Sequence, residues 1–275
     1  MSKTILKWAG NKSKVMPAII PHFPSKFNAY VEPFAGALGS YLNSGIDITK
    51  HSIHLNDTNT ELINLYECVR LDSQRVLNIA NALKRDEASF YSIRSWDKQP
   101  NWQQTYDKWH QAARTLYLNK QAYNGLYRVN KSGQFNTPYC QKAKVGDLID
   151  NDTLTEFLSM IQNVTFYNED FDKFLMRDFG PNTLYYLDPP YVDIKNPNKP
   201  FDGYQCSFGL QEQQLIVQHM TRLSNNGHKV VVSNSYCPTT IQLYQGFKQH
   251  TVKAPRNISA KASSRGMIDE ILVTN

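Results

Sequence analysis

The sequence predicts an α/β protein with a mainly parallel, open β-sheet, into which a mostly helical segment is inserted. Three observations predict this fold. Short apolar runs alternate with amphipathic helical patterns, as in proteins built from βαβ units. Acidic residues follow several of the runs, where polar side chains line the ligand crevice of such a sheet. The alternation stops between about residues 60 and 162, which indicates an insertion.

Six apolar runs are the expected strands. In chain order they cover residues 29–34, 52–55, 164–167, 183–187, 230–232 and 271–273. The first four are predicted to be buried, and the last is expected to add an edge strand. Because the fourth run leads directly into Asp188, that carboxylate is expected at the carboxyl edge of the sheet.

Two helices and one hairpin have clear signals. Asp72 is expected to cap a helix, in which Val76, Ile79, Ala80 and Leu83 follow the i, i+3, i+4, i+7 rule. Leu215, Ile216, Met220 and Leu223 repeat that spacing, and Asn226-Gly227 ends the helix. Within the insertion, residues 130–133 predict a β-hairpin turn.

Composition excludes several classes of protein. The chain has 275 residues, 41% of them hydrophobic, which is enough for a full core without disulfides or metals. No apolar run is long enough to span a membrane, and the first residues lack an apolar signal core. The four cysteines lie far apart, and His51 and His54 have no third ligand nearby. We therefore expect a cytoplasmic protein with no membrane segment, disulfide scaffold or metal site.

The distribution of charge indicates a polyanionic partner. The net charge is only +6, but three segments contain basic residues and no acid. They are residues 1–31 with five lysines, 108–146 with seven basic residues and 213–268 with seven more. Tyrosines and phenylalanines are interleaved with the second segment. These segments are expected to form positive surface, which favours nucleic acid over the alternative of ordinary solvated faces.

The most specific motif is Asp188-Pro189-Pro190-Tyr191, at the end of the fourth expected strand. Two prolines stop further strand pairing and fix the backbone. An aspartate beside a proline carbonyl suits an exocyclic amine, which has two N–H donors, and Tyr191 offers a flat face for a planar base. A plain turn is the alternative interpretation.

A second motif follows the first expected strand. Residues 32–40 read EPFAGALGS, and their small side chains allow a ligand to approach the backbone. The spacing is not G-x-G-x-x-G, which disfavours a dinucleotide oxidoreductase. Asp57, at the end of the second strand, is placed where a carboxylate binds ribose hydroxyls. A nucleoside site and a structural glycine turn are both compatible with this motif alone.

Together these motifs resemble the Dam-type DNA adenine-N6 methyltransferases, which are specific for GATC. The likeness covers nearly the whole chain: KWAGNK from Lys7, EPFAG, NxxELIxLY from Asn59, YNGLYRVN from Tyr123, QFNTPY from Gln134, DPPY, SNS from Ser233 and AKASSRGMIDEILVTN at the end. The motif order resembles the alpha class of amino-methyltransferases. Asn11 and Leu38 stand where that family usually has glycine, and Gln141 replaces a frequent arginine.

The resemblance implies a fold, a cofactor and domains. It implies a Rossmann-like sheet that binds S-adenosyl-L-methionine, formed by residues 1–59 and 163–275. Residues 60–162 would form the inserted, mainly helical target-recognition domain with its hairpin. The expected substrate is an adenine flipped out of double-stranded DNA, and we expect a monomer that needs no metal. The resemblance is equally compatible with an enzyme that accompanies a restriction nuclease, a phage-encoded enzyme and an orphan methylase.

The resemblance also assigns residues. The expected cofactor-binding residues are Trp8, Ala9, Lys12, Phe34, Gly36, Ala37, Asp57, Asp170, Phe171 and Asp188. The expected catalytic residues are Asp188, Pro189, Pro190 and Tyr191. The expected DNA-binding residues are Lys7, Tyr123, Asn124, Leu126, Arg128 and Pro138, with Lys7 at the first guanine.

Elementary chemistry agrees with this assignment. The N6 amine of adenine is a poor nucleophile because its lone pair is delocalised into the ring. Hydrogen bonds from N6 to Asp188 and to the Pro189 carbonyl would free that lone pair for in-line attack on a methyl group. Two alternatives stay open: an amino-methyltransferase that acts on RNA or on a protein glutamine, and a DNA-binding protein that has lost catalysis.

Overall fold

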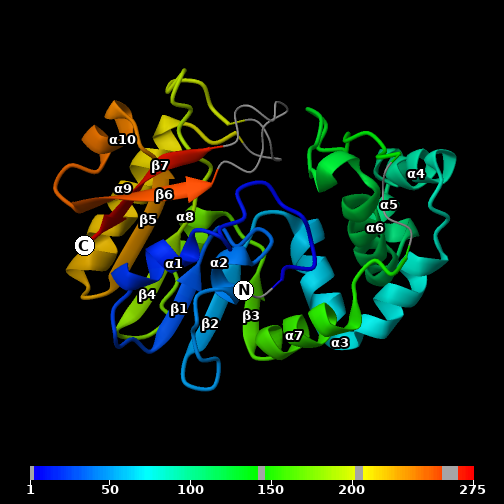
Figure 1. The fold of residues 1–275 in the computed structure, drawn as a ribbon, viewed down its shortest axis with the longest axis horizontal. Helices are drawn as coiled ribbons and strands as arrows, with labels where there is room; N and C mark the ends of the chain where they lie inside the picture. The colour runs from blue at the N-terminus through cyan, green and yellow to red at the C-terminus, as the bar shows by residue number, and fades with distance from the viewer. Residues whose placement is uncertain (1–2, 142–145, 202–206, 256–265) are drawn as a thin grey trace.

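The computed structural model describes residues 3–141, 146–201, 207–255 and 266–275 (Figure 1). Seven strands form one sheet in the order β3-β2-β1-β4-β5-β7-β6. They are β1 Ala29–Glu32, β2 Ser52–Asn56, β3 Val164–Tyr167, β4 Thr183–Leu187, β5 Lys229–Ser235, β6 Lys248–Pro255 and β7 Met267–Thr274. The first five are parallel, whereas β7 pairs antiparallel with both β5 and β6. The predicted α/β fold with a mainly parallel sheet is confirmed.

Both faces of the sheet are covered, which explains why its central strands are continuously apolar. Side chains of β4 alternate between two hydrophobic cores: Leu184 and Tyr186 lie in one, Tyr185 and Leu187 in the other. The first core includes residues of α1 Met16–Ile19, α2 Gly39–Leu42, α3 Thr60–Ala82 and α7 Asn151–Ile161. The second includes residues of α8 Phe171–Leu175 and α9 Leu210–Asn225. Short helices η1 Ile20–His22 and α10 Pro238–Leu243 complete this part.

One expectation about the sheet is wrong. Residues 271–273 belong to β7, which lies inside the sheet, and the edge strand beyond it is β6. The sequence signal of β6 is weak because only Val252 and Ala254 of its eight residues are buried. An edge strand next to solvent needs few apolar residues, so no apolar run marks it.

The segment between β2 and β3 is mostly helical, as predicted, and lies to one side of the sheet (Figure 1). It contains α3, α4 Glu87–Arg94, η2 Ser95–Lys98, α5 Trp102–Thr105, α6 Lys108–Gln121, η3 Tyr123–Gly125 and α7. Asp72 interrupts α3 with a φ of −159° and accepts a hydrogen bond from the Arg75 N–H at 3.0 Å. It therefore caps the second half of α3, which confirms the predicted cap.

The predicted hairpin is present in this segment. Val129 and Phe135 form an antiparallel bridge, and the Asn130 N–H donates to the Gln134 carbonyl at 2.8 Å. A third hydrophobic cluster lies within the insertion and contains Phe90 and Tyr117. In contrast, both halves of α3, part of α6 and α7 pack in the core that covers the sheet. The domain boundaries at residues 60 and 162 stay a prediction.

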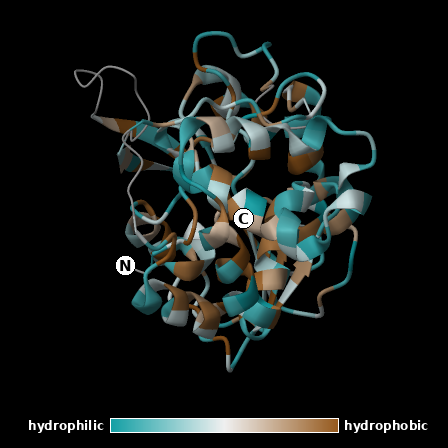
Figure 2. Cartoon of the chain, turned by 90° about the vertical axis from the view of Figure 1, so that its right-hand side faces the viewer, coloured by the Kyte–Doolittle hydropathy of each residue, from teal (hydrophilic) through white to brown (hydrophobic). Residues whose placement is uncertain are grey.

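Figure 2 looks onto the helical side of the molecule, where polar and apolar residues alternate along the helices. Among the described residues, no helix combines the length and the apolar character that crossing a membrane requires. Part of the last sequence motif, residues 260–265, lies outside the described residues.

Candidate active site

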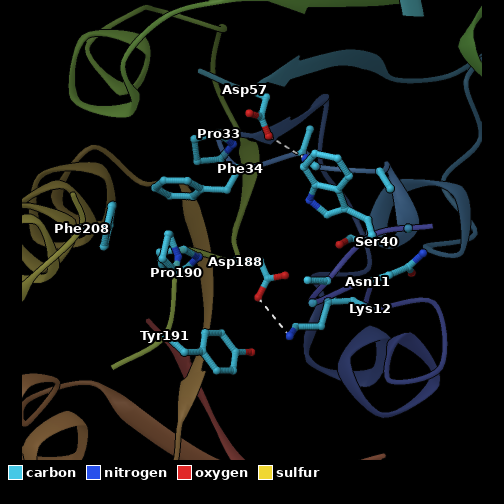
Figure 3. A pocket seen from close by; sticks show the side chains of 18 of the residues that line it. Asn11, Lys12, Pro33, Phe34, Ser40, Asp57, Asp188, Pro190, Tyr191 and Phe208 are labelled. Carbon is cyan, nitrogen blue, oxygen red and sulfur yellow. Dashed lines mark hydrogen bonds and ion pairs between the residues drawn. The ribbon is translucent and has the colours of Figure 1, made fainter. Parts of the chain in front are cut away.

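A cavity of about 530 Å³ opens at the carboxyl ends of the parallel strands. It lies where β1 and β4 are neighbours and the strand order reverses. The loops that follow these two strands diverge there, which creates the usual crevice for a ligand of an open α/β sheet. Its walls come from the N-terminal segment, from the loops after β1, β2, β3 and β4, and from residues of α9, β6 and β7. Figure 3 shows Asp188 between Asp57 and Tyr191 within this cavity.

The structure brings all the expected cofactor and catalytic residues to this one cavity. Its lining includes Trp8, Ala9, Lys12, Phe34, Gly36, Ala37, Asp57, Asp170, Phe171, Asp188, Pro189, Pro190 and Tyr191. Sequence reasoning missed other lining residues, among them Asn11, Ser40, Asn59, Phe208, Glu212 and Glu270. Asn59 lies in the NxxELIxLY motif and Glu270 in the C-terminal motif, whereas Phe208 had no local signal for a site.

Asp57 joins the loops after β1 and β2. Its carboxylate accepts a hydrogen bond from the Gly36 N–H at 2.9 Å and another from the Asn59 N–H at 2.9 Å. Burial raises the pKa of Asp57, and these two hydrogen bonds oppose the rise. A fixed, buried carboxylate that lines a cavity is suited to accept hydroxyl hydrogen bonds.

The loop after β1 requires left-handed backbone. Gly36 has a φ of +48°, and a Cβ at this position would lie 3.2 Å from the Trp8 indole. Leu38, where the resembling family usually has glycine, adopts a φ of +62° and is completely buried. This conformation costs a non-glycine residue about 1 kcal/mol or more. Burial of the leucine side chain in the main core offsets that cost.

Four charged or polar groups meet beside the Pro-Pro turn. The Lys12 ammonium lies 3.4 Å from Asp188 Oδ1, 3.6 Å from Glu270 Oε2 and 4.3 Å from the centre of the Tyr191 ring. The Tyr191 hydroxyl donates to Glu270 Oε2 at 2.8 Å. Burial raises the pKa of Asp188 to about 6, with a further rise from Glu270 and a lowering by Lys12. Asp188 is therefore ionised at neutral pH but protonates in mild acid.

The Asp-Pro-Pro-Tyr loop is fixed from behind by polar side chains. Gln213 of α9 donates from Nε2 to the Pro190 carbonyl at 2.8 Å, and its Oε1 accepts from Asn234 Nδ2 at 2.9 Å. Asn234 Oδ1 in turn accepts the Val192 N–H at 3.2 Å. Asn234 belongs to the SNS motif, which forms the end of β5, so this motif supports the loop rather than lining the cavity. These hydrogen bonds fix the geometry of the loop at the cavity.

The expected DNA-binding residues lie outside the cavity but close to one another. The Tyr123 N–H donates to the Pro138 carbonyl at 2.9 Å, and the Lys7 side chain packs directly against Gly125. Tyr123 is exposed, and Arg128 is an exposed hairpin residue whose Nε donates to Asn136 Oδ1 at 2.8 Å. These residues therefore share one region next to the N-terminal segment.

Among the described residues, the positive-surface expectation fails at Lys12, which is buried in the cavity, and at Arg114. Arg114, in the second acid-free segment, is completely buried. Its guanidinium lies 3.3 Å from Glu61 Oε1 and 2.7 Å from Asp97 Oδ2. A long side chain in a helix that packs against α3 is drawn inward by two buried carboxylates, so Arg114 is not available to phosphates.

Among the described residues, no group of three or more His, Cys, Asp or Glu side chains is arranged to hold a metal ion. The sheet is that of a Rossmann-like methyltransferase. Its cavity is lined by the Asp57 carboxylate, which is placed to bind ribose hydroxyls, and by the Asp-Pro-Pro-Tyr loop.

Comparison with known proteins also indicates a methyltransferase. Residues 8–258 match the model of the family described as D12 class N6 adenine-specific DNA methyltransferase. The chain belongs to this family and is an adenine-specific DNA methyltransferase, so it uses a methyl donor and acts on DNA.

Named relatives match almost end to end. The retron Ec67 DNA adenine methylase of Escherichia coli is 32% identical over 99% of this chain and 91% of its own length. The DNA adenine methylase of Escherichia coli K12 is 31% identical over 98% and 94%. The type II methyltransferase M1.LlaDCHI of Lactococcus lactis subsp. cremoris is 29% identical over 98% and 94%.

Proposed function

We propose that this enzyme transfers the methyl group of S-adenosyl-L-methionine to N6 of an adenine that is flipped out of duplex DNA, within the sequence GATC. The observation that carries the proposal is the position of Asp188 and its Pro-Pro-Tyr turn in the same cavity as the Asp57 carboxylate. One cavity can thus receive a nucleoside-containing donor and a planar base.

The cavity fits the proposed donor. Asp57 would accept the two ribose hydroxyls, and Asp170 would accept from the adenine amino group. The rings of Phe34 and Phe171, with centroids 5.2 Å apart, offer apolar surface for an adenine. Trp8 would lie along the donor. When bound, S-adenosylmethionine supplies an electrophilic methyl group on its sulfonium.

The residues of the loop after β4 would prepare the target nitrogen. The Asp188 carboxylate and the Pro189 carbonyl would accept the two N6–H groups, which draws the nitrogen toward tetrahedral geometry. The Tyr191 ring would stack on the base. An adenine inside a duplex cannot reach a cavity of this kind, so it must leave the helix at a cost of a few kcal/mol. Stacking on Tyr191 returns about 1–3 kcal/mol of that cost.

Target recognition is assigned to the insertion together with Lys7. Arg128 is exposed on the hairpin and has the donor geometry to bind guanine O6 and N7. Tyr123, Asn124, Leu126 and Pro138 would contact the DNA or the base left without its partner. GATC is proposed because the central and C-terminal motifs resemble those of Dam-type enzymes. We also propose that the enzyme acts as a monomer in the cytoplasm.

The test uses labelled S-adenosylmethionine with unmethylated duplexes that contain GATC or a scrambled site, followed by nucleoside analysis. Label in N6-methyladenine on the GATC duplex alone is the expected result. Label on both duplexes would refute the site but keep the chemistry. No label on DNA, with the donor still bound, would refute the proposal and favour RNA, protein glutamine or an inactive DNA binder.

The role of Asp188 has its own test. Asp188→Ala should abolish methyl transfer, because no carboxylate remains to accept from N6, while DNA binding in a gel-shift assay stays within about threefold of the parent. Substantial residual turnover would contradict the assigned role.

A further inference from the structure

Glu270 lines the cavity although it lies near the C-terminus of the chain, far in sequence from Lys12 and Asp188. It lies on β7, where it pairs in register with Ser235 of β5 and with Val252 of β6. The residue is only 5% exposed, yet it lines the cavity next to the Pro-Pro-Tyr turn. A buried carboxylate costs free energy unless charged or hydrogen-bonding partners compensate it. The partners of Glu270 are groups of the active site.

Two contacts connect Glu270 to the residues at the target base. The Tyr191 hydroxyl donates to Glu270 Oε2 at 2.8 Å. The Lys12 ammonium lies 3.6 Å from the same oxygen and 3.4 Å from Asp188 Oδ1. One ammonium therefore lies between two buried carboxylates, and Glu270 competes with Asp188 for it.

We propose that Glu270 is a positioning residue for methyl transfer, which orients the Tyr191 ring and shares Lys12 so that Asp188 stays free to accept from the target amine. This inference rests on the proposed function. Without the Glu270 charge, Lys12 would pair with Asp188 alone. The ammonium would then occupy lone pairs that the N6–H group needs, and the Tyr191 ring would lose the contact that sets its angle.

Asp188 is also placed to accept the proton that the target amine releases. When the N6 lone pair bonds to the methyl carbon and the carbon–sulfur bond breaks, the sulfur keeps the electron pair and N6 becomes cationic. One N6–H proton must then leave, and the carboxylate that accepts that hydrogen bond is placed to take it. Because Lys12 is shared with Glu270, Asp188 stays more basic than it would be if Lys12 paired with Asp188 alone.

The pH dependence follows from the groups that face Asp188. These are Lys12 from the N-terminal segment, Glu270 from β7, Tyr191 from its own loop, Tyr186 from β4, and Glu32 and Tyr30 from β1. After burial itself, the negative charge of Glu270 contributes to the raised pKa of Asp188 of about 6. Neutralising Glu270 should lower that pKa, so the acid limb of the rate profile should move to lower pH.

The experiment compares Glu270→Gln with the parent enzyme in single turnovers on a saturating GATC duplex across about pH 5 to 8.5. Glutamine keeps the size and can still accept from Tyr191, so only the charge is removed. We expect the rate at neutral pH to fall about tenfold, which corresponds to about 1.4 kcal/mol, and the acid limb to move down by about half a pH unit. Donor and DNA affinities should not change.

Asp269→Asn is the matched control, because it removes the same charge from the neighbouring residue. Asp269 is half-exposed, and its Oδ1 lies 2.6 Å from the Lys253 ammonium instead of contacting a residue of the cavity. The rate and the pH profile of the Asp269→Asn enzyme should equal those of the parent enzyme. An equal change in both variants would overturn the proposal, because it would indicate only a general charge effect.

Other outcomes are equally decisive. A Glu270→Gln enzyme with the parent's rate and profile, or one that loses only donor affinity, would overturn the proposal. If this variant does not fold, Tyr191→Phe removes the hydrogen bond between Tyr191 and Glu270, which Glu270→Gln keeps, and must slow the single turnover; an unchanged rate would overturn the proposal. A parent enzyme that makes no N6-methyladenine would refute the proposed function itself, before any variant is compared.

Discussion

Asn119 fastens the N-terminal segment to the insertion. It is only 4% exposed and belongs to α6. Its Oδ1 accepts the Lys7 N–H at 2.9 Å, while its Nδ2 donates to the Lys7 carbonyl at 2.7 Å and to the Gly125 carbonyl at 3.0 Å. One buried amide thus binds both backbone groups of a residue that is 112 positions away.

Asn119→Ala should destabilise the protein by about 2–3 kcal/mol. Each of the three hydrogen bonds contributes about 1 kcal/mol net, and groups left buried without a partner cost more. The full cost of burying unpaired backbone groups is not reached, since the N-terminal segment can separate from the insertion and its backbone can then bind water. The same separation should weaken donor binding, because Trp8 next to Lys7 lines the cavity and stacks on Tyr127 with centroids 5.1 Å apart.

Urea unfolding at equilibrium measures the first effect, and titration with S-adenosylhomocysteine measures the second. Asn119→Asp keeps the acceptor for the Lys7 N–H but turns a buried carboxylate oxygen toward two carbonyl oxygens, so it should destabilise the protein at least as much as Asn119→Ala. Asn78→Ala is the control: this exposed helix residue accepts a side-chain hydrogen bond from Gln74 four positions earlier, so its effect should stay within about 0.5 kcal/mol. A loss below about 1 kcal/mol for Asn119→Ala would refute the reasoning.

Three further predictions follow from buried charge and from the exposed hairpin. Arg114→Ala leaves Glu61 and Asp97 buried without their cation and should cost about 3–5 kcal/mol in urea unfolding; a loss below about 1 kcal/mol would contradict the network. Burial raises the pKa of Glu32 to about 8 from 4.5. The folded state therefore holds this proton more tightly, and its contribution to stability is lost as pH rises through that interval. Glu32→Gln should lose less stability than the parent between about pH 5 and pH 8, and parallel curves would disprove this. Arg128→Ala should lower discrimination at one base pair by about 1–3 kcal/mol in kcat/KM on singly substituted sites, whereas an equal loss on all sequences would reduce Arg128 to a phosphate contact.

Local patterns in the sequence were sufficient for much of the sheet. The strands β3 and β4 have the bounds that their apolar runs predict. The helix with Ile216, Met220 and Leu223 buried is α9, which ends before Asn226-Gly227. These features depend on residues within a few positions of one another, through side-chain periodicity and turn chemistry. The same is true of the Asp-Pro-Pro-Tyr motif, whose place directly after a buried strand fixed its position at the cavity.

Long-range packing decided the rest. The sequence by itself determined the class of fold, the residues at the ends of β1, β2 and β4, and the mostly helical insertion. Only the tertiary structure decided that β7 lies inside the sheet, that Arg114 is buried, and that Glu270 faces Tyr191. Arg114 and Glu61 are 53 positions apart, and Tyr191 and Glu270 are 79 apart. No local periodicity encodes such pairs, because burial and charge pairing bring them together only when the sheet and the helices have assembled.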